Sequence, residues 1–525
     1  TFMEPFHRRL HVVLGAPNWQ NMRVWKVLYH TKGITMLRVQ CLETPIPREK
    51  RRFGRAWLAM CDTPYGSLPV LSVAGEPEEM GRQYGTLVGD LVKSLSSRLV
   101  TIFTSAGLPE AVARHILGNA WERMSPYAPE EYLVELEGLV SGARQAGVDL
   151  SLDDLRCIVA ATNFDLYKRE ERIFEFLDPE VIQQLQQQPE MGEGHLQCTM
   201  LAVWGKRTVD GKMYSFRNLD WLSQSGMHEE RLITVMHREG AVPVMSAGYA
   251  GVTGCLAGMN AQGITLAEVG AFSVCEDLDG IPWTFLGRQV LDRSTSLDDA
   301  VRIIAKARHT IGYNYLIADG DPDRFGTPHF RPRAAAFETN RKACEVFFDN
   351  DPQEAEATWM APDGTIHRYG LPLEHAVMRA DTAFGKTTRA LQACDDGPGE
   401  PENTGNPWGR DFCGSTYTTC HKPMYDMVRA FETGEEYVFP VRNIRVIEKG
   451  EPRKIGLDET LVIAATVAHN TECLADNDWN VMSVVYAATD GQMAVAYESR
   501  NERNEWKNAP DSGYALFASR ELLEP

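Results

Sequence analysis

The chain has 525 residues, 43% of them hydrophobic and 24% charged, so it has enough apolar material to bury a sizeable core. Its formal net charge of -19, with no Lys/Arg-rich block, would repel phosphate backbones and makes nucleic acid a poor candidate partner. The sequence has no run of about 18 apolar residues that would predict a membrane span, and residues 1–9 lack the order of a signal peptide. The 11 cysteines are scattered, which fits a reducing compartment, and the cytoplasm is the expected location.

The first part of the chain predicts strands followed by helices. Residues 1–75 mix short apolar runs with basic and proline-rich stretches, and we expect strands and loops there. From residue 76 the apolar side chains fall on one face at helical spacing, and further helices are expected over about 95–146 and 152–176. Residues 178–194 are rich in Gln and Gly, and they are either an interdomain connector or a loop that presents a bond for cleavage.

After residue 197 short β-rich runs predominate, and several end in Asp-Gly turns that are typical of hairpins. Strands are expected at 199–204, 213–217, 232–237, 242–247, 263–269, 313–318, 481–487 and 493–498, with a helical stretch at 286–307. Groups of strands separated by helices favour antiparallel sheets covered by helices over a doubly wound parallel sheet.

Cys198 begins the first of these strands and is the candidate nucleophile. A thiol becomes a good nucleophile only as the thiolate. If the bond between Gln197 and Cys198 were cut, the new α-amino group could serve as the base, because its pKa of about 7.7–8.0 lies near the working pH. A hairpin at Asp210-Gly211 would then bring Arg217 and Asp220 close to the thiol. On spacing alone, a small buried cysteine and a surface ion pair explain these residues at least as well.

The stretch from Cys198-Thr199 through Val209-Asp210-Gly211 to Phe216-Arg217-Asn218-Leu219-Asp220-Trp221 resembles the choloylglycine hydrolases. It is closer still to the autoproteolytic acyltransferase family named for isopenicillin N acyltransferase. Four further motifs match that family in the same order, at 79–85, 258–264, 313–319 and 480–486. The resemblance therefore spans residues 70 to about 490.

This resemblance implies an α+β fold, the four-layer αββα sandwich of N-terminal-nucleophile hydrolases. Residues 1–197 would form a propeptide or α-chain that begins with strands and loops and continues mainly as helices. Residues 198–525 would form the catalytic β-chain. Cys198 would be both the autoproteolytic and the catalytic nucleophile. Arg217 would lie near the thiolate, Asp220 toward the α-amine, and Asn314 would face the nucleophile.

Two positions depart from the family pattern. Asp381 stands where relatives carry an Asn of the oxyanion hole, and a carboxylate there would repel the oxyanion unless it were protonated. Either Asp381 has another role, such as binding a cationic substrate, or the alignment fails there. The segment 267–270 replaces an Asn or Tyr of the relatives. Gly270 offers a backbone N–H for the oxyanion, whereas Glu268 is either an acid in the pocket or, more simply, an outward-facing strand residue.

Together these features predict a self-processing cysteine amidase or acylase that cleaves a C–N bond of a small-molecule amide through an acyl-Cys198 intermediate. Water is the favoured acceptor, and transfer to an amine is the variant reaction. The alternative is an unprocessed or catalytically silent scaffold that binds a ligand. A papain-like protease is disfavoured because no His stands in a matching motif.

No metal site or cofactor is expected, since zinc-ligand spacing and nucleotide-binding fingerprints are missing from the sequence. The expected partners are therefore the amide substrate and the two chains of one precursor, which should stay packed together after cleavage. A homodimer is the default expectation for the assembly.

Overall fold

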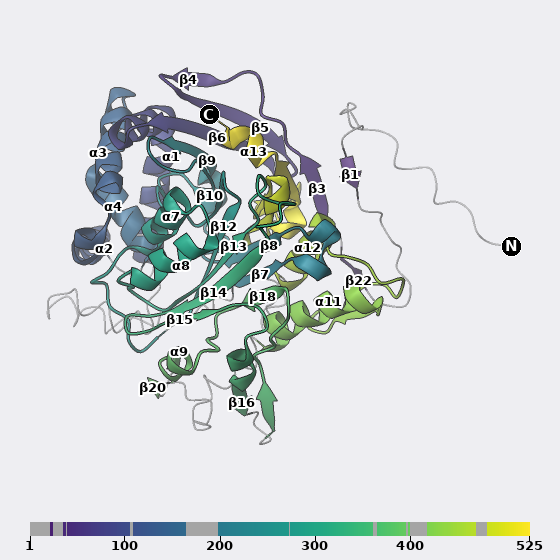
Figure 1. The fold of residues 1–525 in the computed structure, drawn as a ribbon. Coiled ribbons are helices and arrows are strands. Elements are labelled where there is room, and N and C mark those ends of the chain that lie inside the picture. The colour runs from purple at the N-terminus through teal and green to yellow at the C-terminus, as the bar shows by residue number, and fades with distance from the viewer. Residues whose placement is uncertain are drawn as a thin grey trace.

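The structure is a computed structural model of the chain, and it describes residues 22–24, 35–37, 39–105, 109–163, 198–271, 273–360, 365–394, 397–398, 417–468 and 480–524. Gln197, the predicted connector at 178–194 and the end of the predicted helix 152–176 lie outside these residues. Two large sheets form the centre of the molecule, and helices lie outside them (Figure 1).

The first sheet has eight strands and is mostly antiparallel. Its order is β1 (Met22–Val24), β3 (Gln40–Glu43), β27 (Tyr514–Phe517), β24 (Gln492–Tyr497), β23 (Asn480–Ala487), β8 (Tyr214–Asp220), β7 (Thr199–Val203) and β18 (Ala376–Arg379). The strand that follows Cys198 therefore lies between β8, which carries Arg217 and Asp220, and β18, which leads to Asp381.

The second sheet has ten strands. Its order is β15 (Cys344–Phe347), β14 (Arg333–Thr339), β13 (Tyr313–Asp319), β12 (Ile264–Gly270), β11 (Ala257–Asn260), β10 (Val244–Tyr249), β9 (Arg231–Arg238), β6 (Gly66–Gly75), β5 (Ala56–Thr63) and β4 (Arg51–Phe53). The sheets contact each other face to face: the hydroxyls of Ser215 and Thr265 lie 3.1 Å apart, and Tyr486 donates to the carbonyl of Leu266.

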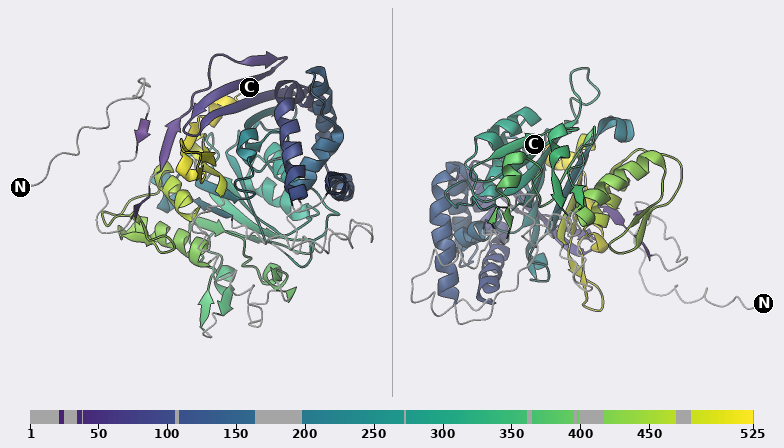
Figure 2. Two further views of the ribbon diagram at one scale, coloured as in Figure 1. Left: turned by 180° about the vertical axis from the view of Figure 1, so that it is seen from behind. Right: turned by 90° about the horizontal axis from the view of Figure 1, so that it is seen from below.

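Helices cover the sandwich on both sides, as the right-hand view of Figure 2 shows. The ten-stranded sheet packs against α1 (Pro77–Ser105), α7 (Trp283–Arg293) and α8 (Leu297–Lys306), and α2 (Glu110–Met124), α3 (Glu130–Gln145) and α4 (Leu152–Ala161) pack around α1. The eight-stranded sheet packs against α12 (Leu457–Val467), which contacts α11 (Lys422–Thr433). The predicted four-layer αββα sandwich is confirmed.

The remaining strands and α-helices of the described chain are smaller. These are β2 (Thr35–Met36) with β22 (Ile444–Ile447) and β21 (Tyr437–Phe439), the hairpins β16 (Thr358–Met360)/β17 (Ile366–Arg368), β19 (Ala393–Cys394)/β20 (Gly397–Pro398) and β25 (Ser499–Arg500)/β26 (Trp506–Lys507), and the helices α9 (Lys386–Ala390) and α13 (Ser519–Leu523). Within the described residues no helix combines the length and apolarity needed to cross a lipid bilayer.

Most predicted elements are present, with one informative difference. The predicted helix at 286–307 is two helices, α7 and α8. The break occurs because Ser294 leaves the helical conformation and the Ser296 side chain accepts the backbone N–H of Asp299, which starts a new helix.

The N-terminal part of the chain contributes strands to both sheets. β6 lies inside the ten-stranded sheet, antiparallel to β5 and parallel to β9, with Val70 paired with Ile233. β3 pairs with β27 in the eight-stranded sheet. The predicted boundary at 197/198 therefore does not divide the fold into two bodies, because strands from both sides of it share the same hydrogen-bonded ladders.

The motif at 79–85 has a packing role in α1. Gly81 and Gly85 lie against the backbone of α3, so that a Cβ on Gly85 would overlap the carbonyl oxygen of Leu139. Gln83 exchanges two hydrogen bonds of 2.8 Å with the backbone of Ala74, which ties α1 to the end of β6. Tyr84 accepts the backbone N–H of Gly251 at 3.0 Å.

This close approach predicts that Gly85→Ala lowers the free energy of unfolding by about 1–3 kcal/mol or more, because α1 and α3 must separate. Gly118→Ala in α2 is the matched control, since Gly118 has open space around it and alanine favours the helix by about 0.5–1 kcal/mol. Urea titration of both variants measures the difference. Equal effects of the two substitutions would contradict the packing role.

Candidate active site

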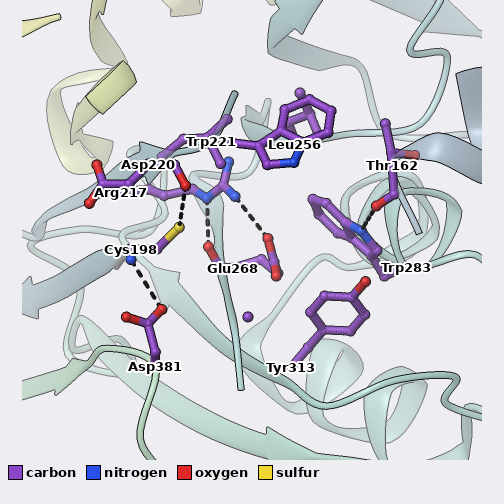
Figure 3. Close-up of a pocket in the computed structure, with 12 residues that line it drawn as sticks. Thr162, Cys198, Arg217, Asp220, Trp221, Leu256, Glu268, Trp283, Tyr313 and Asp381 are labelled. Atoms are coloured by element: carbon purple, nitrogen blue, oxygen red, sulfur yellow. Dashed lines mark hydrogen bonds and ion pairs between the residues drawn. The ribbon is translucent and has the colours of Figure 1, made fainter. Parts of the chain in front are cut away.

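Cys198 immediately precedes β7, and its side chain is buried between the sheets with 6% of its surface exposed. Its Sγ lies 3.9 Å from the carbonyl oxygen of Asp220. β7 pairs with β8 so that Met200 lies opposite Arg217 and Thr199 opposite Asn218. The thiol and the Arg217 side chain therefore face the same pocket, which Figure 3 shows.

Strand alternation explains the motif on β8. Asn218 points to the helical layer, where its Nδ2 donates to the carbonyl of Ala464 in α12 at 2.8 Å. Its neighbours Arg217 and Leu219 point to the other side and line the pocket. Asn218 thus holds β8 against α12, while the Arg217 side chain points into the pocket.

Arg217 is fully buried and forms an ion pair with Glu268 across the two sheets. Its Nη2 lies 2.8 Å from Glu268 Oε2, and its Nε donates to the Glu268 carbonyl oxygen at 2.6 Å. Glu268 is 3% exposed, so the simpler assumption of an outward-facing residue was wrong. Burial of the strand end explains the error, because a carboxylate is stable there only with a cationic partner.

The structure places Asp381 at the backbone nitrogen of Cys198, the position for which the resemblance names Asp220. The Cys198 N–H donates to Asp381 Oδ1 at 3.1 Å. This follows from register: β18 pairs with β7 so that Arg379 lies opposite Met200, which brings Asp381 level with Cys198. The Asp220 carboxylate accepts Nδ2 of Asn480 at 2.8 Å.

Asn314 reaches the site indirectly. Its Nδ2 donates to the carbonyl oxygens of Ala380 and Thr382, at 2.8 and 3.2 Å, and so holds the backbone on both sides of Asp381. The Gln392 side chain adds hydrogen bonds to the Asp381 carbonyl and to the N–H of Ala383. Asn314 and Gln392 are therefore positioning residues for Asp381.

Aromatic side chains form the far wall of the pocket (Figure 3). The rings of Trp283 and Tyr313 lie 5.5 Å apart, and the guanidinium of Arg217 lies 5.9 Å from the Trp283 ring. Trp283 is fixed by the end of α4, since its Nε1 donates to the Thr162 carbonyl at 2.6 Å and its backbone N–H to Asn163 Oδ1 at 2.8 Å. Residues from both sides of position 197 thus build the pocket.

Neither Trp283 nor Thr162 is among the site residues that the sequence predicts. An aromatic residue at a helix start carries no signal that separates a pocket wall from a core. The other lining residues are Leu219, Asp220, Trp221, Leu256 and Gly270, and Gly270 is the predicted oxyanion candidate.

The buried acids control protonation in the pocket. Burial raises the pKa of the Cys198 thiol well above its ordinary value, and the charges of Asp381 and Asp220 raise it further, while Arg217 opposes them. Burial also raises the pKa of the Asp381 carboxyl well above its usual range, although the Cys198 N–H works against this shift. In the uncleaved chain the thiol is therefore protonated at neutral pH.

Within the described residues no cluster of three or more His, Cys, Asp or Glu side chains is arranged to hold a metal ion. The described side chains that line the pocket also include no histidine.

The family comparison agrees with the predicted resemblance. Residues 207–335 match the model of the family described as acyl-coenzyme A:6-aminopenicillanic acid acyl-transferase. The segment includes Arg217, Asp220, Glu268, Gly270 and Asn314, and it begins after Cys198 and ends before Asp381.

One curated relative, an uncharacterized protein of Archaeoglobus fulgidus, is 24% identical over 257 residues, which are 48% of this chain and 41% of the relative. The chain thus spans less than half the length of that relative.

Among solved structures, an N-acylethanolamine-hydrolyzing acid amidase ortholog from Caenorhabditis elegans has a TM-score of 0.33 at 12% identity, covering 56% of this chain and 93% of that one. A mutant conjugated bile acid hydrolase from Clostridium perfringens has a TM-score of 0.33 at 14% identity, with coverage of 58% and 90%. Penicillin V acylase from Agrobacterium tumefaciens has a TM-score of 0.29 at 12% identity, with coverage of 60% and 88%. The assignment of the fold rests on the layers and strand order of the chain itself.

The matched segment 207–335 also contains the loop that follows β8 and carries Trp221 into the pocket wall. Leu222 and Gln224 adopt positive φ angles of 34° and 62°, which side chains other than glycine rarely do. Glu498 stabilises this loop, because its Oε2 accepts Ser223 Oγ at 3.0 Å and the Gln224 N–H at 3.1 Å. Burial raises the pKa of Glu498 to about 7.

A raised carboxyl pKa makes stability fall as pH rises. The unfolded chain loses the Glu498 proton near pH 4.5 and the folded chain near pH 7, so the penalty grows between these values and reaches on the order of 3 kcal/mol above pH 7. Glu498→Gln should therefore raise the melting temperature at pH 8 and change it little at pH 4.5. Scanning calorimetry at both pH values checks this, with the exposed Glu521→Gln as control. An equal gain at both pH values would exclude titration of Glu498 as the cause.

Proposed function

We propose that this protein is a self-processing cysteine amidase that cleaves a C–N amide bond through an acyl-Cys198 intermediate. The observation that carries the proposal is that the thiol and the backbone nitrogen of one residue face a single pocket lined with charged side chains. Cys198 presents its Sγ beside Asp220 and Arg217, and its nitrogen beside Asp381.

Processing would begin with attack of the Cys198 thiol on the carbonyl carbon of Gln197. The C–N bond breaks, the Gln197 acyl group moves to sulfur as a thioester, and the nitrogen keeps its own hydrogen and takes up the proton lost by the thiol to become an α-amine. Water then hydrolyses the thioester, which leaves the Gln197 carboxylate on one chain and a free Cys198 thiol with a free α-amine on the other.

Turnover would use the new α-amine as the base. It takes the thiol proton, the thiolate attacks the substrate amide carbon, and the proton passes to the leaving amine as the C–N bond breaks. Water then releases the acyl group from Cys198 as a carboxylic acid. The pocket supports this assignment, because its described lining has no histidine that could serve as the base instead.

The pocket is consistent with a small-molecule amide that has an apolar acyl group. Trp221, Leu256, Trp283 and Tyr313 offer apolar surface beside the thiol. Water is the preferred acceptor of the acyl group because no second binding site is then needed, and transfer to an amine is the outcome that a product analysis would distinguish.

Cleavage would leave two chains that remain together. Arg288 in α7 is fully buried and pairs with Glu135 in α3, with Nη2 and Oε2 2.8 Å apart, and the Arg288 guanidinium lies 4.7 Å from the Tyr132 ring. Breaking such a buried pair costs about 3–5 kcal/mol. Together with the β6–β9 ladder, this contact supports a stable two-chain enzyme.

If Cys198 is the processing nucleophile, Cys198→Ala should yield only the full-length chain and no amide hydrolysis. Intact mass spectrometry under denaturing conditions reads the processing directly: the wild type should give two fragments that meet at Gln197–Cys198. Cys61→Ala, which alters another buried cysteine, is the control and should be cleaved like the wild type. Cleavage that persists in Cys198→Ala would refute the mechanism.

The charges around the thiol predict opposite effects on its reactivity. Glu268→Gln should speed labelling of Cys198 by iodoacetamide several-fold near neutral pH, because loss of a negative charge lowers the thiol pKa. Arg217→Gln should slow labelling, because loss of the cation raises the thiol pKa.

The double variant Arg217→Gln/Glu268→Gln controls for the buried charge that each single change leaves behind. Its labelling rate should fall between the two single variants. Rates that move in the same direction in both single variants would show that altered access, and not charge, governs the thiol.

A further inference from the structure

We propose that Asp381 is a catalytic residue that acts in its protonated form, accepting a hydrogen bond from the nitrogen of Cys198 through Oδ1 and donating one from Oδ2 to the oxyanion of the tetrahedral intermediate. This inference rests on the proposed amidase function, and it assigns to that site the donor that stabilises its negative charge.

The charges in the pocket require one acid to be neutral. Three carboxyl groups line the described pocket, those of Asp220, Glu268 and Asp381, and Arg217 is the one cationic side chain among its described lining residues. All four side chains are 4% exposed or less. Three ionised carboxylates beside one cation would leave a surplus of buried negative charge, which is costly unless a proton is taken up.

The contacts indicate which carboxyl group holds that proton. Glu268 pairs with Arg217, and Asp220 accepts the amide of Asn480. Asp381 has the backbone N–H of Cys198, and the charged groups that act on it most strongly are the acids Asp220 and Glu268. Arg379, at the end of β18, gives it no compensation, because that guanidinium pairs with Glu338 and Glu354. The raised pKa of Asp381 agrees with this assignment.

A neutral carboxyl group has one hydroxyl donor, and its position follows from the contacts. Oδ1 accepts the Cys198 N–H, so the proton belongs on Oδ2. Oδ2 is buried and has no hydrogen-bond partner within the described part of the chain. A donor left unpaired in the ground state and satisfied by a developing oxyanion contributes to the transition state alone, which is what accelerates a reaction.

The donor is also held in place before substrate arrives. Asn314 binds the carbonyls that flank Asp381, and Gln392 binds its own carbonyl. Such preorganisation is what makes an oxyanion donor effective.

A neutral Asp381 agrees with the role of the α-amine as well. A carboxylate 3.1 Å from this nitrogen would stabilise the ammonium form and raise the pKa of the amine, and the base would be lost at neutral pH. A neutral carboxyl group accepts the hydrogen bond without holding the proton on nitrogen.

Two variants separate a neutral donor from an anionic anchor. Asp381→Asn keeps an acceptor and supplies an N–H donor, so we expect kcat to fall no more than about tenfold, whereas Asp381→Ala should lose about 10²–10³-fold. Equal losses in both variants, with cleavage at Gln197–Cys198 intact in both, would overturn the proposal, since an anionic anchor would be damaged by either change.

A second readout needs no turnover and also covers a variant that folds poorly. The infrared difference spectrum of wild type minus Asp381→Asn at pH 7 should contain the C=O stretch of a protonated carboxyl group, and the carboxylate bands in its place would overturn the proposal. Failure of the amidase function itself is recognised separately, as a wild-type protein that is neither cleaved at Gln197–Cys198 nor active on amides.

Discussion

The buried ion pair between Arg217 and Glu268 is the contact on which the site depends. It joins β8 of one sheet to β12 of the other at the edge of the pocket that holds the Cys198 thiol. An arginine without this partner would be an uncompensated buried charge, and so would the glutamate. The pair therefore fixes the distance between the sheets at the pocket, and it engages the one cation of the described pocket lining. The other two carboxyl groups of the pocket, Asp220 and Asp381, must then be stabilised by hydrogen bonds or neutralised by a proton.

This charge balance connects the two stages of the proposed chemistry. In the uncleaved chain, burial and nearby acids keep the thiol protonated, so Cys198 is a weak nucleophile toward external reagents. Processing would add a base at the nitrogen of the same residue, beside a carboxyl group that is already in place. Activation would then require no movement of the sheets, since the bond that is cut itself creates the missing group.

Local sequence patterns predicted much of the fold. The features of the site that the sequence did not predict depend on contacts between residues far apart in the chain. The Asp210-Gly211 turn between two strand patterns led to the prediction that Arg217 returns beside Cys198, and the observed pairing of β7 with β8 places both side chains at one pocket. Glu268 was misjudged because its partner lies on the opposite sheet, and a strand pattern contains no information about what faces it. Asp381 was associated with the oxyanion hole only by resemblance, since a four-residue strand such as β18 gives no signal of its register against β7. The link between Thr162 and Trp283 joins residues 121 positions apart, which no periodicity could indicate.

The parallel pairing of β6 with β9 also constrains the order of events during synthesis. Val70 can pair with Ile233 only after more than 160 further residues have left the ribosome, and contacts of such sequence separation form late in folding. The ten-stranded sheet therefore cannot close before the segment that carries Cys198 has been made. A peptide bond cut before that point would turn an intramolecular pairing into an encounter between two separate chains. The geometry that places Cys198, Arg217 and Asp381 together exists only once the sheets have assembled, so the fold itself would delay the proposed cleavage until strands from both sides of position 197 are paired.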